Sequence, residues 1–206
     1  MREYVDQEFA VYVDTRQERW LRGATLVCLD PVKAGSALRA AFARLAMRWG
    51  RVDDPDAYTL RLLYERIARR RLPWSKEPAS EQGAVLSALG QLSPVQRAVV
   101  VLVAYEELTV VEVGNLLEMS HMAVREQLQG ALSKLQAELG TSSSRIQDVQ
   151  LMLAEAVDGV LSPGLADDAW AAGAALGRRR RRTGYWAAVA LVVAAIISLL
   201  LFGLAQ

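Results

Sequence analysis

Several side chains with hydrogen-bonding groups lie close together near the middle of the chain, at the start of a predicted helix. The stretch TVVEVGNLLEMSHMAVREQLQ predicts a helix at 110–117, a turn at 118–120 and a longer helix capped by Ser120. This layout is typical of a helix-turn-helix, whose second helix places its first residues against base edges in the major groove. Helix pairs of this outline also arise as plain packing, so the pattern leaves both interpretations open. If the pair binds DNA, its outward residues are the expected contacts: Ser120, His121, Met122, Arg125, Glu126 and Gln129.

A second group of candidate contacts lies earlier in the chain. Six basic residues and a single acid, Glu65, lie between Arg61 and Lys76. Such a surface could meet DNA phosphates, although arginines at a helix end are also favoured by the helix dipole alone. Between residues 105 and 139 acids predominate, so the helix-turn-helix has little electrostatic attraction for DNA phosphates. The candidate phosphate contacts of the first group are Arg61, Arg66, Arg69, Arg70 and Arg71.

The other reactive residue types do not assemble into a catalytic or metal site. The single cysteine, Cys28, lies in the apolar run TLVCL and is predicted to be a buried small side chain. The one histidine, His121, has no partner at metal-ligand spacing. There is no glycine-rich phosphate loop, and no Ser/His or Cys/His constellation. We therefore expect no enzymatic activity, no cofactor and no metal.

The elements that must position these residues are predicted to be helices. Most of the chain has helical spacing and little alternation, which indicates an all-α protein. Leu38, Phe42, Leu45 and Trp49 form one apolar stripe. Pro55 with its flanking aspartates predicts the start of a helix. That helix is expected to bury Ala57, Leu60, Leu63, Tyr64 and Ile67.

Two capping boxes predict further helix starts. Ser93 with Gln96, and Thr109 with Glu112, have the required spacing. The prolines of LPWSKEPASEQG predict a linker before these helices, and GTSSS predicts a break after them. Beyond the break, apolar residues at helical spacing predict one more amphipathic stretch: Ile146, Val149, Leu153 and Val157.

The stretch GRRRRRTGYWAAVALVVAAIISLLLFGLAQ predicts a membrane anchor. The residues from Tyr185 to Leu204 carry no charge and, as a helix, are about as long as a bilayer is thick. The arginine run predicts that the N-terminal body lies in the cytoplasm, and the aromatic pair suits the membrane interface. Small residues at four-residue spacing would permit weak self-association in the membrane. The predicted topology residues are Arg178, Arg179, Arg180, Arg181, Arg182, Tyr185 and Trp186.

Two blocks of the chain resemble one family. The run LGQLSPVQRAVVVLVAYEELTVVEVGNLLEMSHMAVREQLQGALSKLQ resembles region 4 of extracytoplasmic function (ECF) sigma factors. Further upstream, FARLAMRW followed by DDPDAYTLRLLYERIARRR is similar to region 2 of the same family. The resemblance implies two helical domains joined by a flexible linker, and binding to core RNA polymerase. It also implies that region 2 recognises and melts the −10 promoter element and that region 4 recognises the −35 element.

The chain departs from the family at several contact positions. Where region 2 of the family carries acids that dock on the polymerase, this chain has Gly35, Ser36, Arg39 and Ala40, which weakens pairing with a basic partner. Arg39 and Arg44 are the remaining candidates for polymerase contact. Glu65 stands where the −10 reading helix often has asparagine, Glu118 where the turn has glycine, and Gly130 where region 4 commonly has a phosphate-contacting arginine.

We therefore predict a region 2-like domain at 4–72, a linker at 73–84 and a region 4-like domain at 85–140. A juxtamembrane segment at 141–183 and a membrane helix with a short tail at 184–206 follow. The main hypothesis is a membrane-anchored sigma factor with core RNA polymerase and promoter DNA as partners, and an anti-sigma factor as a further candidate. The alternative is a degenerate sigma-like protein that binds a sigma factor, an anti-sigma factor or polymerase at the inner membrane face.

The juxtamembrane segment allows two hypotheses of its own. Its apolar stripe suggests that residues 145–177 fold onto the sigma domains and hold them closed. A simple spacer between the body and the membrane would also fit the sequence.

Overall fold

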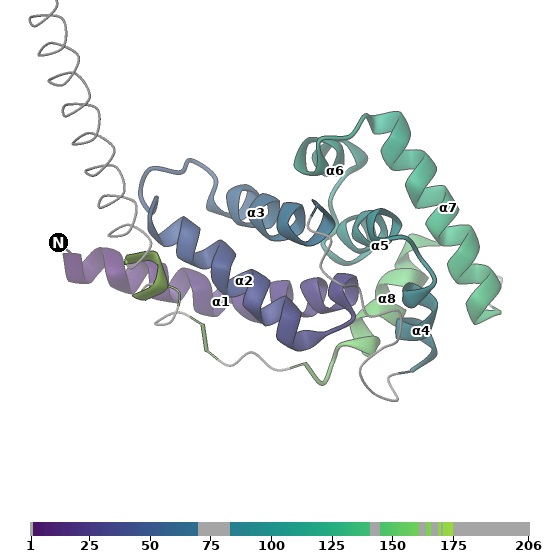
Figure 1. Ribbon diagram of the computed structural model, residues 1–206, viewed down its shortest axis with the longest axis horizontal. Coiled ribbons are helices and arrows are strands. Elements are labelled where there is room, and N and C mark those ends of the chain that lie inside the picture. Colours follow the sequence, from purple (N-terminus) through teal and green to yellow (C-terminus); the bar gives the residue numbers. More distant parts are fainter. Residues whose placement is uncertain are drawn as a thin grey trace, which may run out of the picture.

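The computed structural model describes residues 2–69, 83–140 and 145–160, with residues 164, 165, 169 and 171–174. Every element in this part of the chain is a helix, which agrees with the predicted all-α fold (Figure 1). In order they are α1 (Arg2–Cys28), α2 (Pro31–Ala46), α3 (Pro55–Arg69), α4 (Ala84–Gly90), α5 (Pro94–Val100), the π-helical turn η1 (Val101–Tyr105), α6 (Val110–Leu117), α7 (His121–Leu139) and α8 (Ile146–Ala156).

The first three helices pack together, and local sequence signals set where two of them begin. Asp30 caps α2, since its carboxylate accepts hydrogen bonds from the backbone N–H groups of Val32 (2.9 Å) and Lys33 (3.1 Å). Asp54 accepts a hydrogen bond from the backbone N–H of Ala57 (3.0 Å) and caps α3 in the same way. The predicted helix start at Pro55 is therefore confirmed.

The predicted apolar faces are largely, but not wholly, correct. Leu38, Phe42 and Leu45 are buried in α2. The helix ends at Ala46, so Trp49 lies in the following turn, where its ring meets that of Phe9 at 5.2 Å between centroids.

The expected buried face of α3 is confirmed at three positions and wrong at one. Leu60, Leu63 and Tyr64 are buried. Ala57 is exposed because it faces an open cleft, and Thr59 is buried instead. The Ile67 side chain lies outside the described residues.

Both predicted capping boxes are present. The Ser93 hydroxyl accepts from the backbone N–H of Gln96, whose side chain accepts from the backbone N–H of Ser93, both at 3.2 Å. Thr109 and Glu112 make the same reciprocal pair at the start of α6. These caps begin α5, which packs against α7, and α6, which is the first helix of the helix-turn-helix.

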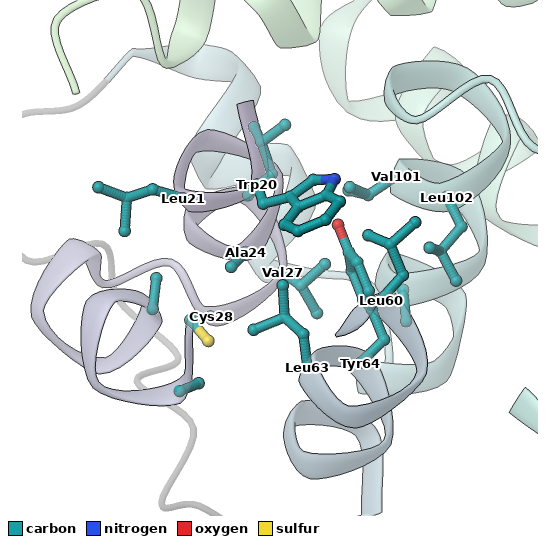
Figure 2. Packing of buried hydrophobic residues seen from close by; sticks show 14 of the residues in the cluster. Trp20, Leu21, Ala24, Val27, Cys28, Leu60, Leu63, Tyr64, Val101 and Leu102 are labelled. Atoms are coloured by element: carbon teal, nitrogen blue, oxygen red, sulfur yellow. The ribbon is translucent and has the colours of Figure 1, made fainter. Parts of the chain in front are cut away.

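The two predicted domains share one hydrophobic core. In Figure 2, Trp20 and Val27 of α1 and Leu60 of α3 lie beside Val101 and Leu102 of η1. Because apolar surface from both domains is removed from water at this contact, the contact itself stabilises a closed arrangement. Residues 70–82, which include most of the linker predicted at 73–84, lie outside the described part of the chain.

The segment after α7 also packs on the body. Helix α8 contacts η1 and α4, and its Val149 and Leu153 are buried, as is Val157 just beyond it. The predicted amphipathic helix is therefore confirmed, with Ile146 half-buried at its start.

The predicted membrane anchor cannot be placed in the same way. Residues 184–206, the arginine run and the Tyr185–Trp186 pair lie outside the described residues. Within the described part of the chain, no helix combines the length and the apolar character needed to cross a bilayer.

Candidate nucleic-acid interface

Helices α6 and α7 form the helix-turn-helix that the sequence predicts, with the predicted bounds. Glu118 ends α6 in the left-handed conformation, at φ 56° and ψ 45°. The backbone N–H of Met119 then returns to the carbonyl of Gly114 at 2.9 Å. The Ser120 hydroxyl accepts from the backbone N–H of Ala123 at 3.1 Å and so caps α7.

A close approach at Gly114 sets the position of His121. A Cβ atom at Gly114 would lie 2.9 Å from the carbonyl oxygen of Met119 and 3.0 Å from Cδ2 of His121. The glycine therefore lets the turn and the imidazole lie directly against α6. This places His121 at the edge of the helix pair, at the N-terminal end of α7.

The structure brings the six predicted contact residues together on one exposed end of α7. All six are exposed, and Met122 retains 65% of its accessible surface. On the opposite side of α7, Val124 and Leu135 are buried and Leu128 and Leu132 are half-buried. This surface has the geometry expected of a recognition helix, while contact with DNA stays a prediction.

The electrostatics of this surface are mixed. Arg125 is the one arginine of this surface. Glu126 follows it directly in α7, and Glu118 is exposed in the turn before the helix. Further along α7, the Lys134 ammonium donates to the Gln96 side chain at 3.2 Å. Gly130 lies against the same side chain, since a Cβ there would lie 3.1 Å from Gln96 Nε2. The surface therefore has shape and hydrogen-bonding groups but little net positive charge.

The structure describes few of the side chains in the predicted region 2 contact. Arg61 is exposed on α3, with its guanidinium carbon 5.8 Å from the centre of the Tyr58 ring. Arg66 and Arg69 belong to α3, but their side chains lie outside the described residues, as do Arg70 and Arg71 entirely.

The candidate polymerase contacts lie on α2. Arg39 is half-buried and Arg44 is exposed. Ser36, where the family carries an acid, is also exposed, while Gly35 and Ala40 are half-buried. None of these four positions carries an acid, and Arg39 is the one charged residue among them.

A cleft of about 740 Å³ lies between α1, α3 and α6. Arg61 lines it, together with Arg16 and Asp56, which form an ion pair at 2.7 Å. The cleft has walls from both predicted domains, so its shape depends on how the domains are placed.

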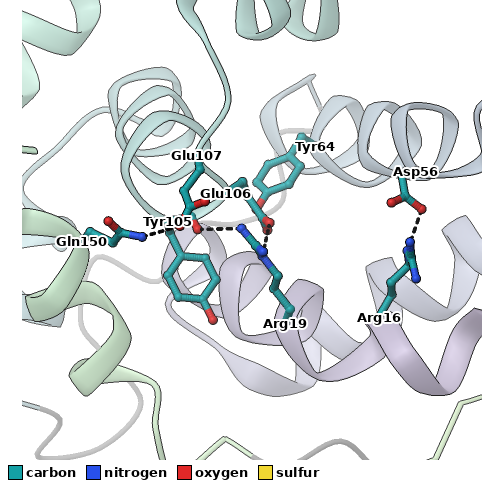
Figure 3. A network of polar contacts seen from close by, with 8 residues as sticks. All are labelled: Arg16, Arg19, Asp56, Tyr64, Tyr105, Glu106, Glu107 and Gln150. Carbon is teal, nitrogen blue, oxygen red and sulfur yellow. Dashed lines mark hydrogen bonds and ion pairs between the residues drawn. The ribbon is translucent and has the colours of Figure 1, made fainter. Parts of the chain in front are cut away.

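A buried carboxylate that lines this cleft joins the two domains (Figure 3). Glu106, just after η1, accepts hydrogen bonds from the Tyr64 hydroxyl at 3.1 Å and from Arg19 Nε at 3.2 Å. Arg19 Nη2 also donates to the Tyr105 carbonyl at 3.3 Å. Burial raises the pKa of Glu106 to about 7, although Arg19 opposes the increase.

A buried arginine makes a second link. Arg97 of α5 is 3% exposed. Its Nη1 donates to the carbonyl of Val27 near the end of α1 at 2.9 Å, and its Nη2 donates to the carbonyl of Leu92 at 3.2 Å. Sequence reasoning assigned no role to Glu106 or Arg97. Both stand in motifs that carry the family resemblance, EELT and QRAV, but neither motif indicates that its charged residue is buried.

Comparisons with known proteins agree with the helix-turn-helix. Residues 88–137 match the family described as Sigma-70, region 4. The chain is 36% identical over 152 residues to the RNA polymerase sigma-E factor of Streptomyces coelicolor, an alignment that covers 64% of this chain and 86% of that protein. It is 33% identical over 152 residues to the protein of the same name from Streptomyces avermitilis (64% and 85% covered). For the one from Streptomyces antibioticus the identity is 34% over 154 residues (65% and 86% covered). No solved structure matches the chain.

Proposed function

Since the chain belongs to the RNA polymerase sigma factor family, we propose that it is a membrane-anchored ECF-type factor that binds core RNA polymerase and promoter DNA to start transcription. The observation that carries the DNA-binding part is the exposed N-terminal end of α7, inside the residues that match region 4. A recognition helix needs this end free to enter a major groove.

The residues of α7 have separate roles in the proposal. Arg125 can donate two hydrogen bonds to a guanine edge, and Gln129 can pair with an adenine edge. Ser120 and His121, at the start of the helix, are placed to reach the phosphate backbone or the first base pair. Together they would read the −35 element.

The remaining contacts are proposed for the other domain. Arg61, Arg66, Arg69, Arg70 and Arg71 would hold DNA of the −10 region, and Arg39 and Arg44 would face polymerase. Since acids are missing from α2, we expect weaker polymerase binding than acids at these positions would give.

The sequence supports a membrane location for this activity. An uncharged stretch that follows five arginines would hold the body on the cytoplasmic side, where DNA is also found. Deletion of residues 184–206 should release the chain from membrane vesicles into the soluble fraction. A full chain that is itself soluble without detergent would contradict the anchor.

Run-off transcription with purified core polymerase tests the proposed function. The chain lacking residues 178–206 should support transcription from its promoter, and a chain that fails to bind core polymerase would overturn the proposal. Arg125→Ala should weaken promoter binding about 5- to 150-fold, from the loss of a base contact of about 1–3 kcal/mol.

The matched control for Arg125→Ala is Lys134→Ala. Lys134 is also an exposed cation of α7, but it lies far from the N-terminal end and bonds Gln96. The Lys134→Ala variant should lose much less affinity for the promoter than the Arg125→Ala variant. Equal effects of the two substitutions would mean that the charge of α7 matters and that its N-terminal end does not read DNA.

A further inference from the structure

The segment that follows α7 contacts both sigma domains at once. We call this segment the clasp, and it comprises the described residues 145–160, 164, 165, 169 and 171–174. In Figure 1, α8 lies beside α4, while the last described residues lie at the other end of the α1–α2 pair. A plain spacer between the body and a membrane would have no need of such contacts.

The first part of the clasp holds the region 4 side. Val149 and Leu153 of α8 are 4% and 1% exposed, and α8 packs on η1 and α4. The Gln150 side chain donates to the Glu107 carboxylate at 2.6 Å. Glu107 directly follows the buried Glu106, so α8 supports the segment that joins the two domains.

The middle of the clasp is tied to α1. Arg22 donates from Nη2 to the Asp158 carbonyl at 3.0 Å and from Nε to the Val160 carbonyl at 3.3 Å. The backbone N–H of Leu165 donates to Gln17 Oε1 at 2.7 Å, and Gln17 is only 8% exposed. Leu165 itself is fully buried. These are specific contacts, since they satisfy backbone groups of the clasp with side chains of α1.

The end of the clasp lies on α2. A Cβ atom at Gly173 would lie 2.7 Å from the Ala43 carbonyl oxygen and 2.8 Å from Ala46 Cβ, so only glycine fits this contact. Ala43 follows Arg39 by four residues and Ser36 by seven, which places the three on one face of the helix. The clasp therefore sits one turn along the face that the proposed function assigns to core polymerase.

We propose that the clasp is an autoinhibitory element: it occupies the C-terminal turn of the polymerase-facing side of α2, at Ala43 and Ala46, while holding the two domains together, and core polymerase must displace it to bind. This proposal rests on the proposed function, because polymerase is the competitor. The clasp also leads directly into the predicted anchor, so its release and the membrane attachment of the chain involve the same stretch of sequence.

Gly173→Leu in the full chain tests the proposal without altering either sigma domain. The leucine cannot fit against Ala43 and should detach the end of the clasp. Gly159→Leu is the matched control, because a Cβ at Gly159 meets nothing within 4 Å. We expect Gly173→Leu to bind core polymerase at least threefold more tightly than the wild type and Gly159→Leu to match the wild type. Equal affinities of the wild type and both variants for core polymerase would contradict the proposal that the clasp is autoinhibitory.

Hydrogen exchange on the free chain separates failure of the clasp from failure of the proposed function. Amides of α2 should exchange faster in Gly173→Leu than in Gly159→Leu. Equal exchange rates would contradict the proposed contact between the clasp and α2, whatever the affinities for polymerase are. If exchange differs but no chain binds polymerase, the proposed function has failed, and autoinhibition of polymerase binding fails with it.

Discussion

At the scale of single residues, Glu106 makes the closed arrangement sensitive to pH. The ordinary pKa of a glutamate is 4.5, and burial raises the pKa of Glu106 to about 7. The folded chain therefore holds this proton more tightly than the unfolded chain does. The resulting stability is present in full below pH 4.5 and is lost as the pH rises through about 7. The gap between the two pKa values corresponds to about 3 kcal/mol.

Glu106→Gln should remove this dependence. The amide stays neutral at every pH and can still accept a hydrogen bond from Tyr64. Denaturant unfolding should show the variant about 2–3 kcal/mol more stable than the wild type at pH 8.5 and within about 1 kcal/mol of it near pH 5. Glu138→Gln, at an exposed carboxylate of α7, controls for the change in net charge. A variant that is less stable than the wild type at both pH values would show that the Arg19–Glu106 pair outweighs burial.

Glu118 is a residue whose backbone is suited to glycine. Its φ of 56° costs an L-amino acid roughly 1–2 kcal/mol, and glycine at this position avoids that cost. Because glycine also makes the unfolded chain more flexible, about half of this gain in stability is lost. Glu118→Gly should stabilise the protein by about 0.5–1 kcal/mol in urea unfolding. It should also strengthen DNA binding, because it removes a carboxylate beside the recognition surface.

The matched control for Glu118→Gly is Glu138→Gly. It removes the same charge from a regular position of α7 and should destabilise the protein by about 1 kcal/mol. If both variants are destabilised alike, the positive φ at Glu118 is not a source of strain.

At the scale of elements, Arg97 fixes α5 against the end of α1. Arg97→Met should cost about 2–4 kcal/mol, because it leaves the buried carbonyls of Val27 and Leu92 without these donors. Arg125→Met, at an exposed position, should change the stability by less than about 0.5 kcal/mol. Equal unfolding midpoints for Arg97→Met and the wild type would show that water satisfies both carbonyls.

The success of sequence reasoning differs between elements for a physical reason. Helix starts at Ser93 and Thr109 were predicted because a cap and its partner lie three residues apart, within one sequence window. The face of α7 was predicted because helical periodicity is local. Glu106 and Arg97 were missed because their partners, Tyr64 and Val27, lie on distant helices. Charged residues are expected at the surface unless such partners are known.

The end of α2 and the buried face of α3 also depend on contacts with other helices. Trp49 continues the apolar spacing of α2 and was expected to be helical, yet the chain leaves the helix after Ala46 and Trp49 reaches Phe9 from a turn. Ala57 is apolar but faces the cleft. Spacing alone cannot tell which apolar residues will find a partner, because that depends on how helices are placed.

At the scale of the whole molecule, the charge distribution predicts weak binding to DNA in the absence of polymerase. The formal net charge is +1, and the exposed end of α7 carries a single arginine. We expect nonspecific dissociation constants of about 10⁻⁴ M or weaker at physiological salt, with a shallow salt dependence. Fluorescence anisotropy of labelled duplex DNA between low and high salt measures both.

A charge-reversed variant tests the same argument from the other side. Glu118→Arg should steepen the dependence of log K on log salt by about one to two, since it removes a repulsion and adds a phosphate contact. An unchanged slope would place the DNA-facing surface elsewhere on the molecule.

The position of Cys28 gives the closed molecule a natural reporter. The thiol is 2% exposed, lies at the end of α1 beside the core that joins the domains (Figure 2), and burial raises its pKa to about 12. A thiol in this state reacts only when the surrounding helices separate. The rate at which a thiol reagent labels the unmodified chain therefore measures how often the body opens, and a partner that opens or closes it should change that rate without any engineered label.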